Sequence, residues 1–190
     1  MKIKSSAFGI LLLLISNVSF SSDNYTLDSK LSSVSFATIK NQFVIEPATI
    51  NTLSGMLDNN GQFDIHVNLN GIDTGIPIRN MRLNDLFFET GKQSPVKVEG
   101  NIDWNSLTEG SHKESLYAKV TLFGKTKLVK FPVVILNAGN TIMVSSSAPV
   151  IISASDFGIP SKNLIALADT VGGIKISDRV PLTLNLTFSK

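Results

Sequence analysis

Residues 62–72 have the sequence QFDIHVNLNGI, in which apolar and polar side chains alternate. A period of two places successive side chains on opposite faces of an extended chain, one toward apolar surroundings and one toward water. The apolar face consists of Phe63, Ile65, Val67 and Leu69. This stretch therefore predicts a β-strand with one buried face.

A turn signal stands directly before this strand. Residues 58–61 read DNNG, and an Asn-Gly pair readily adopts the positive φ angles of a tight hairpin. Residues 53–57 form the candidate strand on the other side of the turn. We expect residues 53–57 and 62–72 to pair as antiparallel strands.

Similar strand-like segments recur along the rest of the chain. They are rich in Val, Ile and Leu, and several alternate with polar residues. The candidates are residues 34–39, 96–104, 116–123, 128–136, 141–154 and 180–188. Gly100 interrupts the second of these segments, and Pro181 stands near the start of the last, where a missing N–H donor is tolerated.

Two short segments show helical spacing instead. In residues 79–88 the apolar positions follow a helical period, with Asn80 as the expected N-cap. Residues 161–169 do so again, between Ser161 as the expected cap and Gly172-Gly173 as the terminator. We expect both helices to cover an end of the sheet rather than to form a helical layer.

Many short strands with few helices are typical of an all-β domain. The pattern favours a single antiparallel β-barrel of about eight strands, with one or two short helices at the ends. A barrel of this size has an interior that side chains fill or that holds one small ligand. A β-sandwich is the competing architecture.

Residues 1–21 have the layout of a secretory signal peptide. Lys2 and Lys4 give a positive start, a mostly apolar core follows, and small residues precede a cleavage site after Ser21. The apolar core is shorter than the roughly 20 residues that cross a bilayer. We therefore expect export to the periplasm or secretion, one domain over residues 22–190, and no stable membrane insertion after cleavage.

The composition argues against several classes of protein. The chain has 17 Lys and Arg and 15 Asp and Glu, so removal of Lys2 and Lys4 leaves a formally neutral domain. It has no basic block that would attract nucleic acid, and no nucleic-acid partner is expected. The lack of cysteine excludes disulfides and thiolate metal sites.

No motif for catalysis or metal binding stands out. His66 and His112 are the only histidines, which is few for a metal site without cysteine. Asp156-Phe157-Gly158 spells the magnesium motif of kinases, but the Gly-rich and catalytic loops that kinases also need are missing. We expect no enzyme activity, no metal and no cofactor.

A set of short motifs in a fixed order resembles the YceI-like family. The motifs are Tyr25-Thr26-Leu27-Asp28 leading through Ser32 and Val34 to Phe36, Asp73-Thr74-Gly75, Arg79-Asn80 with Leu83 and Phe87, Leu122-Phe123-Gly124-Lys125-Thr126, and Asp156-Phe157-Gly158-Ile159. The resemblance implies a lipocalin-like barrel with a long apolar pocket. It also implies binding of a polyisoprenoid, such as a quinone or prenyl phosphate, or of another long-chain lipid such as a fatty acid or its amide.

The chain departs from the family pattern at two positions. Many members carry a His where this chain has Leu31, and another where it has Phe123. Both departures remove a polar group. If those histidines contact a ligand head group in relatives, the head-group preference of this chain differs, whereas the apolar pocket is unaffected.

We assign candidate ligand contacts on this basis. The residues expected to line the pocket for an apolar tail are Phe63, Ile65, Val67, Leu69, Phe87, Val120, Leu122 and Phe157. Arg79 is the candidate for an anionic head group, because a guanidinium suits phosphate or carboxylate. The alternative for Arg79 is an architectural role that ties the helical segment to the rim of the barrel.

Two other functions remain open. An envelope stress or interaction protein would have a solid barrel and no ligand. An enzyme that modifies its bound lipid would need a buried titratable group facing the cavity, since fold does not determine function. A homodimer is compatible with each of these interpretations.

Overall fold

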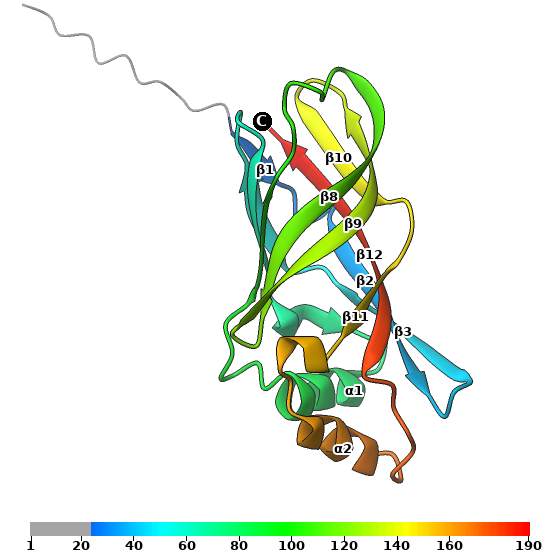
Figure 1. Cartoon of the computed structure of the whole chain (residues 1–190). Helices are drawn as coiled ribbons and strands as arrows, with labels where there is room; N and C mark the ends of the chain where they lie inside the picture. The colour runs from blue at the N-terminus through cyan, green and yellow to red at the C-terminus, as the bar shows by residue number, and fades with distance from the viewer. Residues whose placement is uncertain (1–23) are drawn as a thin grey trace, which may run out of the picture.

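The computed structural model describes residues 24–190, and the predicted signal peptide over residues 1–21 lies outside them. The described residues form one antiparallel sheet of 12 strands with short helices at one end (Figure 1). The strands are β1 (Tyr25–Leu27), β2 (Ser33–Lys40), β3 (Val44–Ile50), β4 (Leu53–Leu57), β5 (Gln62–Val67), β6 (Ile72–Asp73), β7 (Val96–Asn101), β8 (Gly110–Leu122), β9 (Lys125–Asn137), β10 (Thr141–Ser146), β11 (Val150–Ser153) and β12 (Arg179–Ser189). The helical segments are η1 (Leu69–Gly71), α1 (Pro77–Arg82), the π-helical η2 (Leu83–Phe87), η3 (Ser155–Phe157) and α2 (Ser161–Asp169).

Eight of these strands close into a ring. The order is β1, β4, β5, β7, β8, β9, β10 and β12, and β12 pairs back with β1 through Leu27 opposite Phe188. Every pairing is antiparallel, and the longest is that of β8 with β9. The prediction of an all-β antiparallel barrel of about eight strands is confirmed by this barrel-like ring.

The β2–β3 hairpin extends the sheet beyond the ring. β2 pairs with the middle of β12, from Leu182 to Asn185, and β3 pairs with β2 and with the short β6. The end of this hairpin projects from the molecule beside the helices (Figure 1). The α1, η2 and α2 helices gather at this same end, as the sequence predicted for its two helical segments.

The predicted hairpin at the start of the ring is confirmed. β4 and β5 pair with Leu57 opposite Phe63, and Gly61 in the turn has a φ of 82°. A positive φ of this kind is open to glycine without steric cost. The register places the apolar face of β5 on the inside of the ring.

The predicted strand over residues 62–72 is too long. β5 ends at Val67, because the Asn68 side chain accepts a hydrogen bond from the Asn70 backbone N–H at 3.0 Å and starts the turn η1. Local bonds of this kind compete with the β-ladder. The predicted strand over residues 141–154 is divided in a similar way into β10 and β11, with Pro149 in the break.

Both predicted helix caps are wrong. α1 begins after Ile76 with Pro77 in the first turn, and α2 begins after Pro160, so neither has a side-chain cap. Asn80 instead lies inside α1, where its Oδ1 accepts hydrogen bonds from the backbone N–H and the hydroxyl of Thr74 at 2.9 and 2.6 Å. Asn80 therefore ties α1 to the loop that follows β6.

The interior of the ring is apolar and differs along its length. Leu57, Val133, Ile135 and Ile142 are among the most completely buried side chains. Of the cavities described below, two adjoin the helices and a smaller one lies farther along the ring. Among residues 24–190, no helix is long and apolar enough to cross a bilayer.

Candidate functional site

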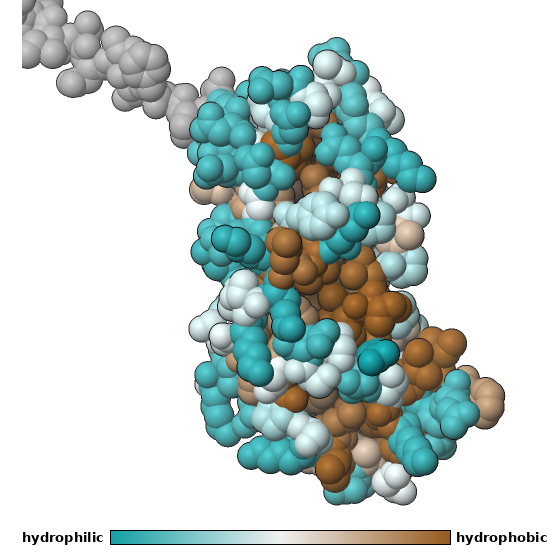
Figure 2. Space-filling model, viewed as in Figure 1, coloured by the Kyte–Doolittle hydropathy of each residue, from teal (hydrophilic) through white to brown (hydrophobic). Residues whose placement is uncertain are grey.

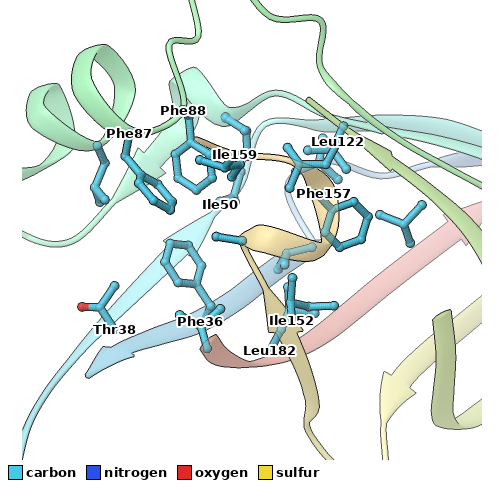
Figure 3. Close-up of a pocket in the computed structure, with 18 of the residues that line it drawn as sticks. Phe36, Thr38, Ile50, Phe87, Phe88, Leu122, Ile152, Phe157, Ile159 and Leu182 are labelled. Carbon is cyan, nitrogen blue, oxygen red and sulfur yellow. The ribbon is translucent and has the colours of Figure 1, made fainter. Parts of the chain in front are cut away.

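The ring encloses an apolar cavity of about 170 Å³ beneath the helices. Of the residues that line it, only Thr38, Ser177 and Asp178 are polar. Figure 3 shows aromatic and aliphatic side chains pointing into this space from strands on one side and from the helical segments on the other. We call it the main cavity. Its apolar walls offer an environment that stays dry and favours apolar guests.

Strands supply the side walls of the main cavity. Because alternate residues of a strand face inward, each strand contributes side chains two positions apart. The strand residues that line the cavity include Val34, Phe36, Ile65, Val67, Val96, Val98, Val120, Leu122, Val180, Leu182 and Leu184. The alternation seen in the sequence of β5 is therefore repeated around the ring.

Helical segments form the end wall. Phe87 and Phe88 follow one another at the end of η2, with ring centroids 4.7 Å apart in an edge-on arrangement. Phe157 in η3 is only 2% exposed, and Leu167 comes from α2. Figure 3 shows Phe87, Phe88 and Phe157 directed toward the same space. These side chains cover the helix end of the main cavity.

The DFG tripeptide builds part of this wall through Phe157. Phe157 ends the turn η3, and Gly158 follows with a φ of 73°, which favours glycine. The left-handed turn at Gly158 lets the chain reverse toward Ile159, which also lines the main cavity.

A smaller cavity of about 40 Å³ continues the apolar interior away from the helices. It shares Ile65, Val98, Phe131, Leu184 and Leu186 with the lining of the main cavity. The two spaces are therefore neighbours along the axis of the ring. The shared side chains form the wall between the two cavities.

A third space, which we call the charged cavity, lies between α1 and the β2–β3 hairpin. Its volume is about 180 Å³, and Lys40, Glu46, Arg79 and Arg82 are among its lining residues. The Arg79 Nη2 donates a hydrogen bond of 2.7 Å to the Glu46 Oε1, and the Lys40 Nζ pairs with the Glu46 Oε2. Two cations therefore share the Glu46 carboxylate, and Arg82 adds a third positive charge to the cavity lining.

The charged cavity and the main cavity lie side by side. Thr38, Leu83, Leu167 and Ile176 line both. A ligand with one apolar part and one anionic part could thus place each part in a matching environment across this shared wall. The arrangement can hold an amphiphile with its charged end between α1 and β3.

The structure distributes the candidate residues over these three spaces. The main cavity is lined by Ile65, Val67, Leu69, Phe87, Val120, Leu122 and Phe157. Phe63 lines the smaller cavity, because it lies nearer the turn that joins β4 to β5. Arg79 lines the charged cavity, where it makes the architectural contact that the sequence offered as an alternative, with Glu46 as the acid.

The sequence analysis missed the contribution of the β2–β3 hairpin to the cavities. Phe36 and Thr38 on β2 line the main cavity, and Lys40 and Glu46 line the charged cavity. The alternation of Val34, Phe36 and Thr38 was a usable signal for β2. No local pattern pointed to Glu46, because it stands before Pro47 in a strand that the sequence did not predict.

A polar latch holds α2 against η2. The buried Asn163 side chain donates hydrogen bonds to the Phe87 carbonyl at 3.0 Å and to the Glu89 Oε2 at 3.1 Å. The Glu89 Oε1 lies 2.9 Å from the Lys92 Nζ. The hydrogen bonds from Lys92 and Asn163 lower the pKa of the Glu89 carboxyl below its usual value, and the contact with Glu89 raises the pKa of Lys92.

The histidines lie apart from the cavities. His66 faces outward from β5, where its Nε2 is 3.1 Å from the Asp64 Oδ1, and His112 contacts the Thr108 carbonyl at 2.6 Å.

Lys97 joins Asp64 and Glu99 on the same outer face, and these contacts raise the pKa of Lys97, with Glu99 as the main cause. Within residues 24–190, no group of three or more His, Asp or Glu side chains is arranged to hold a metal ion.

Comparison with known proteins identifies the family. The model of the YceI-like domain matches residues 25–188. A solved structure of a polyisoprenoid binding domain from Saccharophagus degradans, implicated in plant cell wall breakdown, is 26% identical, with a TM-score of 0.80 over 87% of this chain and 97% of that one. Burkholderia cenocepacia BcnA is 17% identical, with a TM-score of 0.64 over 85% of this chain and 98% of that one, which shows a shared fold.

No curated protein matches the chain. The family match covers the whole ring, from β1 to the penultimate residues of β12, and includes the helices that cover its end. The resemblance found in the sequence motifs is thereby confirmed. The chain belongs to the YceI-like domain family.

Proposed function

We propose that the protein binds one long-chain apolar ligand inside the ring and stores or carries it in the periplasm. The ligand is a polyisoprenoid, such as a quinone or prenyl phosphate, or a fatty acid or its amide. The observation that carries this proposal is the main cavity, whose walls are apolar except at Thr38, Ser177 and Asp178. Placing an apolar chain between such walls lowers the free energy, because apolar surface is removed from water.

The free energy of binding would come from the tail. Removing apolar surface from water contributes about 25 cal/mol per Å², or roughly 0.8 kcal/mol for each buried methylene group. The main cavity and the smaller cavity are adjacent, so a flexible chain could extend from one into the other. Phe63 would then contact the far end of the tail, and Phe87 and Phe157 the part nearest the helices.

The solved polyisoprenoid binding domain supports this choice of ligand. It shares the fold of this chain and 26% of its sequence over nearly its whole length. Leu31 and Phe123 replace the histidines common in relatives, so head-group recognition by this chain would depend on other residues. Arg79 and Arg82 in the charged cavity are suitable, since guanidinium groups bind carboxylate and phosphate.

A binding role fits the main cavity better than catalysis. Asp178 is the one titratable residue in its lining, and the Asp178 Oδ2 accepts hydrogen bonds from the hydroxyls of Ser153 and Ser155 at 2.9 and 3.2 Å. A carboxylate held in this way serves to fix the start of β12 against β11. A solid barrel without a ligand is disfavoured by the unfilled volume itself.

Export by the segment over residues 1–21 completes the proposal. Envelope fractionation and the N-terminal sequence of the purified protein test it. Cleavage near Ser21 with recovery in the periplasmic fraction supports export. A full-length protein recovered with the cytoplasm would contradict it.

Native mass spectrometry of the purified protein, joined to solvent extraction of the same sample, tests ligand binding. We expect a bound species that solvent releases and that yields prenyl or acyl fragments. The control is the cavity-filling variant Val67→Trp, which should carry less of the species. A protein that stays unbound after incubation with envelope lipids would contradict the proposal and favour a ligand-free interaction protein.

A further inference from the structure

We propose that the end of the β2–β3 hairpin and the N-terminal part of α1 form a docking surface for anionic lipid bilayers, which holds the charged cavity against the membrane. We call this surface the apolar rim, and its residues are Phe43, Val44, Ile45, Ile76, Ile78 and Met81. This inference rests on the proposed function, because docking serves to transfer a ligand between bilayer and cavity.

The hairpin end carries three successive apolar side chains in water. Phe43 is 85% exposed, Val44 49% and Ile45 66%. Scattered exposed apolar residues are ordinary, but a contiguous group on a projecting turn marks an interaction surface. The hairpin extends past the ring in Figure 1, and apolar colour continues onto it in Figure 2.

The turn that presents these side chains is well defined. Asn41 and Gln42 have φ values of 48° and 69°, and the Phe43 N–H donates a hydrogen bond of 3.2 Å to the Lys40 carbonyl. The Asn41 N–H donates another, of 2.8 Å, to the Lys175 carbonyl in the segment before β12. The turn end of the hairpin is therefore fixed to this segment, which holds its exposed side chains in a defined position.

α1 supplies the second part of the apolar rim. Ile76 is 42% exposed, Ile78 46% and Met81 51%. Ile76 and Ile78 line the charged cavity together with Lys40 and Glu46, which lie in the half of the hairpin nearest its turn. The two apolar segments thus flank the same cavity, and a surface that contacted both would cover it.

Positive charge accompanies the apolar rim. Lys40, Arg79 and Arg82 line the charged cavity with Glu46 as the only acid in its lining, and the exposed Lys175 lies beside the turn of the hairpin. Apolar side chains that enter the acyl boundary, next to cations that face anionic head groups, are the combination by which proteins bind bilayer surfaces. A protein partner or a second copy would gain nothing comparable from the adjoining charged cavity.

The position of the apolar rim suits the transfer of a lipid between the bilayer and the cavity. A ligand that leaves a bilayer through water exposes its whole tail, at a cost proportional to the apolar area. Contact of the apolar rim with the bilayer would shorten this exposed path. The charged cavity would meet the head group first, and the tail would follow past Thr38 and Leu83 into the main cavity.

Vesicle co-sedimentation of the processed protein tests the docking surface. The probe is a set of vesicles made of phosphatidylcholine alone or of equal parts phosphatidylcholine and phosphatidylglycerol. We expect binding to the anionic vesicles that weakens with salt. The double variant Phe43→Ser/Ile45→Ser should lower the partition coefficient by about tenfold or more, since two exposed apolar side chains lose their burial in lipid.

Two further variants separate the contributions. Lys175→Gln should reduce binding to anionic vesicles by roughly fivefold and leave binding to neutral vesicles unchanged, because one cation is lost near the membrane. Met143→Ser is the matched control: Met143 is 42% exposed on β10, away from the helix end, and its replacement should have no effect.

Three results would overturn the inference: no binding of the unaltered protein to anionic vesicles, equal binding of the Phe43→Ser/Ile45→Ser variant, or a dimer in sedimentation velocity that this variant dissociates. The last result would assign the rim to self-association. Uptake of a fluorescent fatty acid without vesicles is measured separately. If the unaltered protein took up no fatty acid, the proposed function would be refuted. If it took up the fatty acid but did not bind vesicles, only the docking surface would be refuted.

Discussion

The Arg79 guanidinium on α1 donates a hydrogen bond of 2.7 Å to the Glu46 carboxylate on β3, 33 residues earlier in the chain. The other oxygen of Glu46 pairs with Lys40. One acid thus joins a helix to the projecting hairpin and neutralises part of the positive charge in the charged cavity. The charge available for a ligand head group depends on Glu46.

Replacement of Glu46 should change head-group selectivity. In Glu46→Gln, Lys40 and Arg79 lose their acid partner, so affinity for a fatty acid should rise about threefold to fivefold, because an ion pair near a surface contributes up to about 1 kcal/mol. Affinity for the fatty alcohol of equal length should not change. Fluorescence titration with both ligands measures this, with Asp64→Asn on the outer face of β5 as the control. Equal effects on both ligands would show that the head group does not reach this cavity.

Filling the main cavity should prevent tail binding. Val67 is buried and lines the cavity, so Val67→Trp would occupy the space of the tail and reduce affinity about tenfold or more. Overpacking should also lower the free energy of unfolding by about 1–3 kcal/mol. Val134→Trp on the outer face of β9 is the control. Unchanged uptake by the Val67 variant would place the ligand elsewhere.

Gly100 should be intolerant of a side chain because of Phe63. The two residues are paired across β5 and β7, and a Cβ at position 100 would lie 2.3 Å from the Phe63 ring. Gly100→Ala should therefore destabilise the fold by about 1–3 kcal/mol in urea unfolding. Gly91→Ala, where a Cβ meets nothing within 4 Å, should change stability by less than about 0.5 kcal/mol. Similar effects of both substitutions would contradict this contact.

The latch between α2 and η2 should weaken in acid. The hydrogen bonds from Lys92 and Asn163 lower the pKa of Glu89, so its contribution to stability is present above the usual carboxyl pKa of 4.5 and is lost as the pH falls through the lowered value. Hydrogen exchange of α2 amides at several pH values measures the change.

The variant Glu89→Gln should remove this pH dependence and leave α2 less protected at neutral pH. Glu109→Gln, on an exposed loop outside the helix end, is the control and should behave as the unaltered protein. If the protection of the α2 amides from hydrogen exchange did not change with pH in the unaltered protein, the contact of Glu89 with Asn163 would have no role in holding the helix. The cavity wall formed by Leu167 would then be stable without it.

Strand prediction succeeded where the pattern was local. The alternation in β5 and the Asn-Gly turn before it were enough for the β4–β5 hairpin and its register, because both depend on residues that are neighbours in the chain. It failed at β3, where Glu46 and Pro47 interrupt an apolar run. There the strand is stabilised by pairing with β2, which no local pattern records.

The candidate site residues show the same contrast between what a local pattern predicts and what depends on the whole fold. Inward residues such as Val67 and Val120 could be predicted, since a ring places one face of every strand on its interior. Which of three cavities each side chain would reach could not be predicted. Phe63 and Ile65 are two positions apart on one face, yet Phe63 lines the smaller cavity and not the main one.

The sequence by itself determined the all-β fold, the buried face of β5 and, through its ordered motifs, the family. These properties reside in short-range periodicity and in residue identity. Only the tertiary structure decided that a cavity lies beneath the helices, that Glu46 meets Arg79 and Lys40, and that Ile78 and Lys40 line one cavity. A cavity is the volume that packed side chains leave unfilled, and such pairs meet only when strands and helices distant in the chain close the ring.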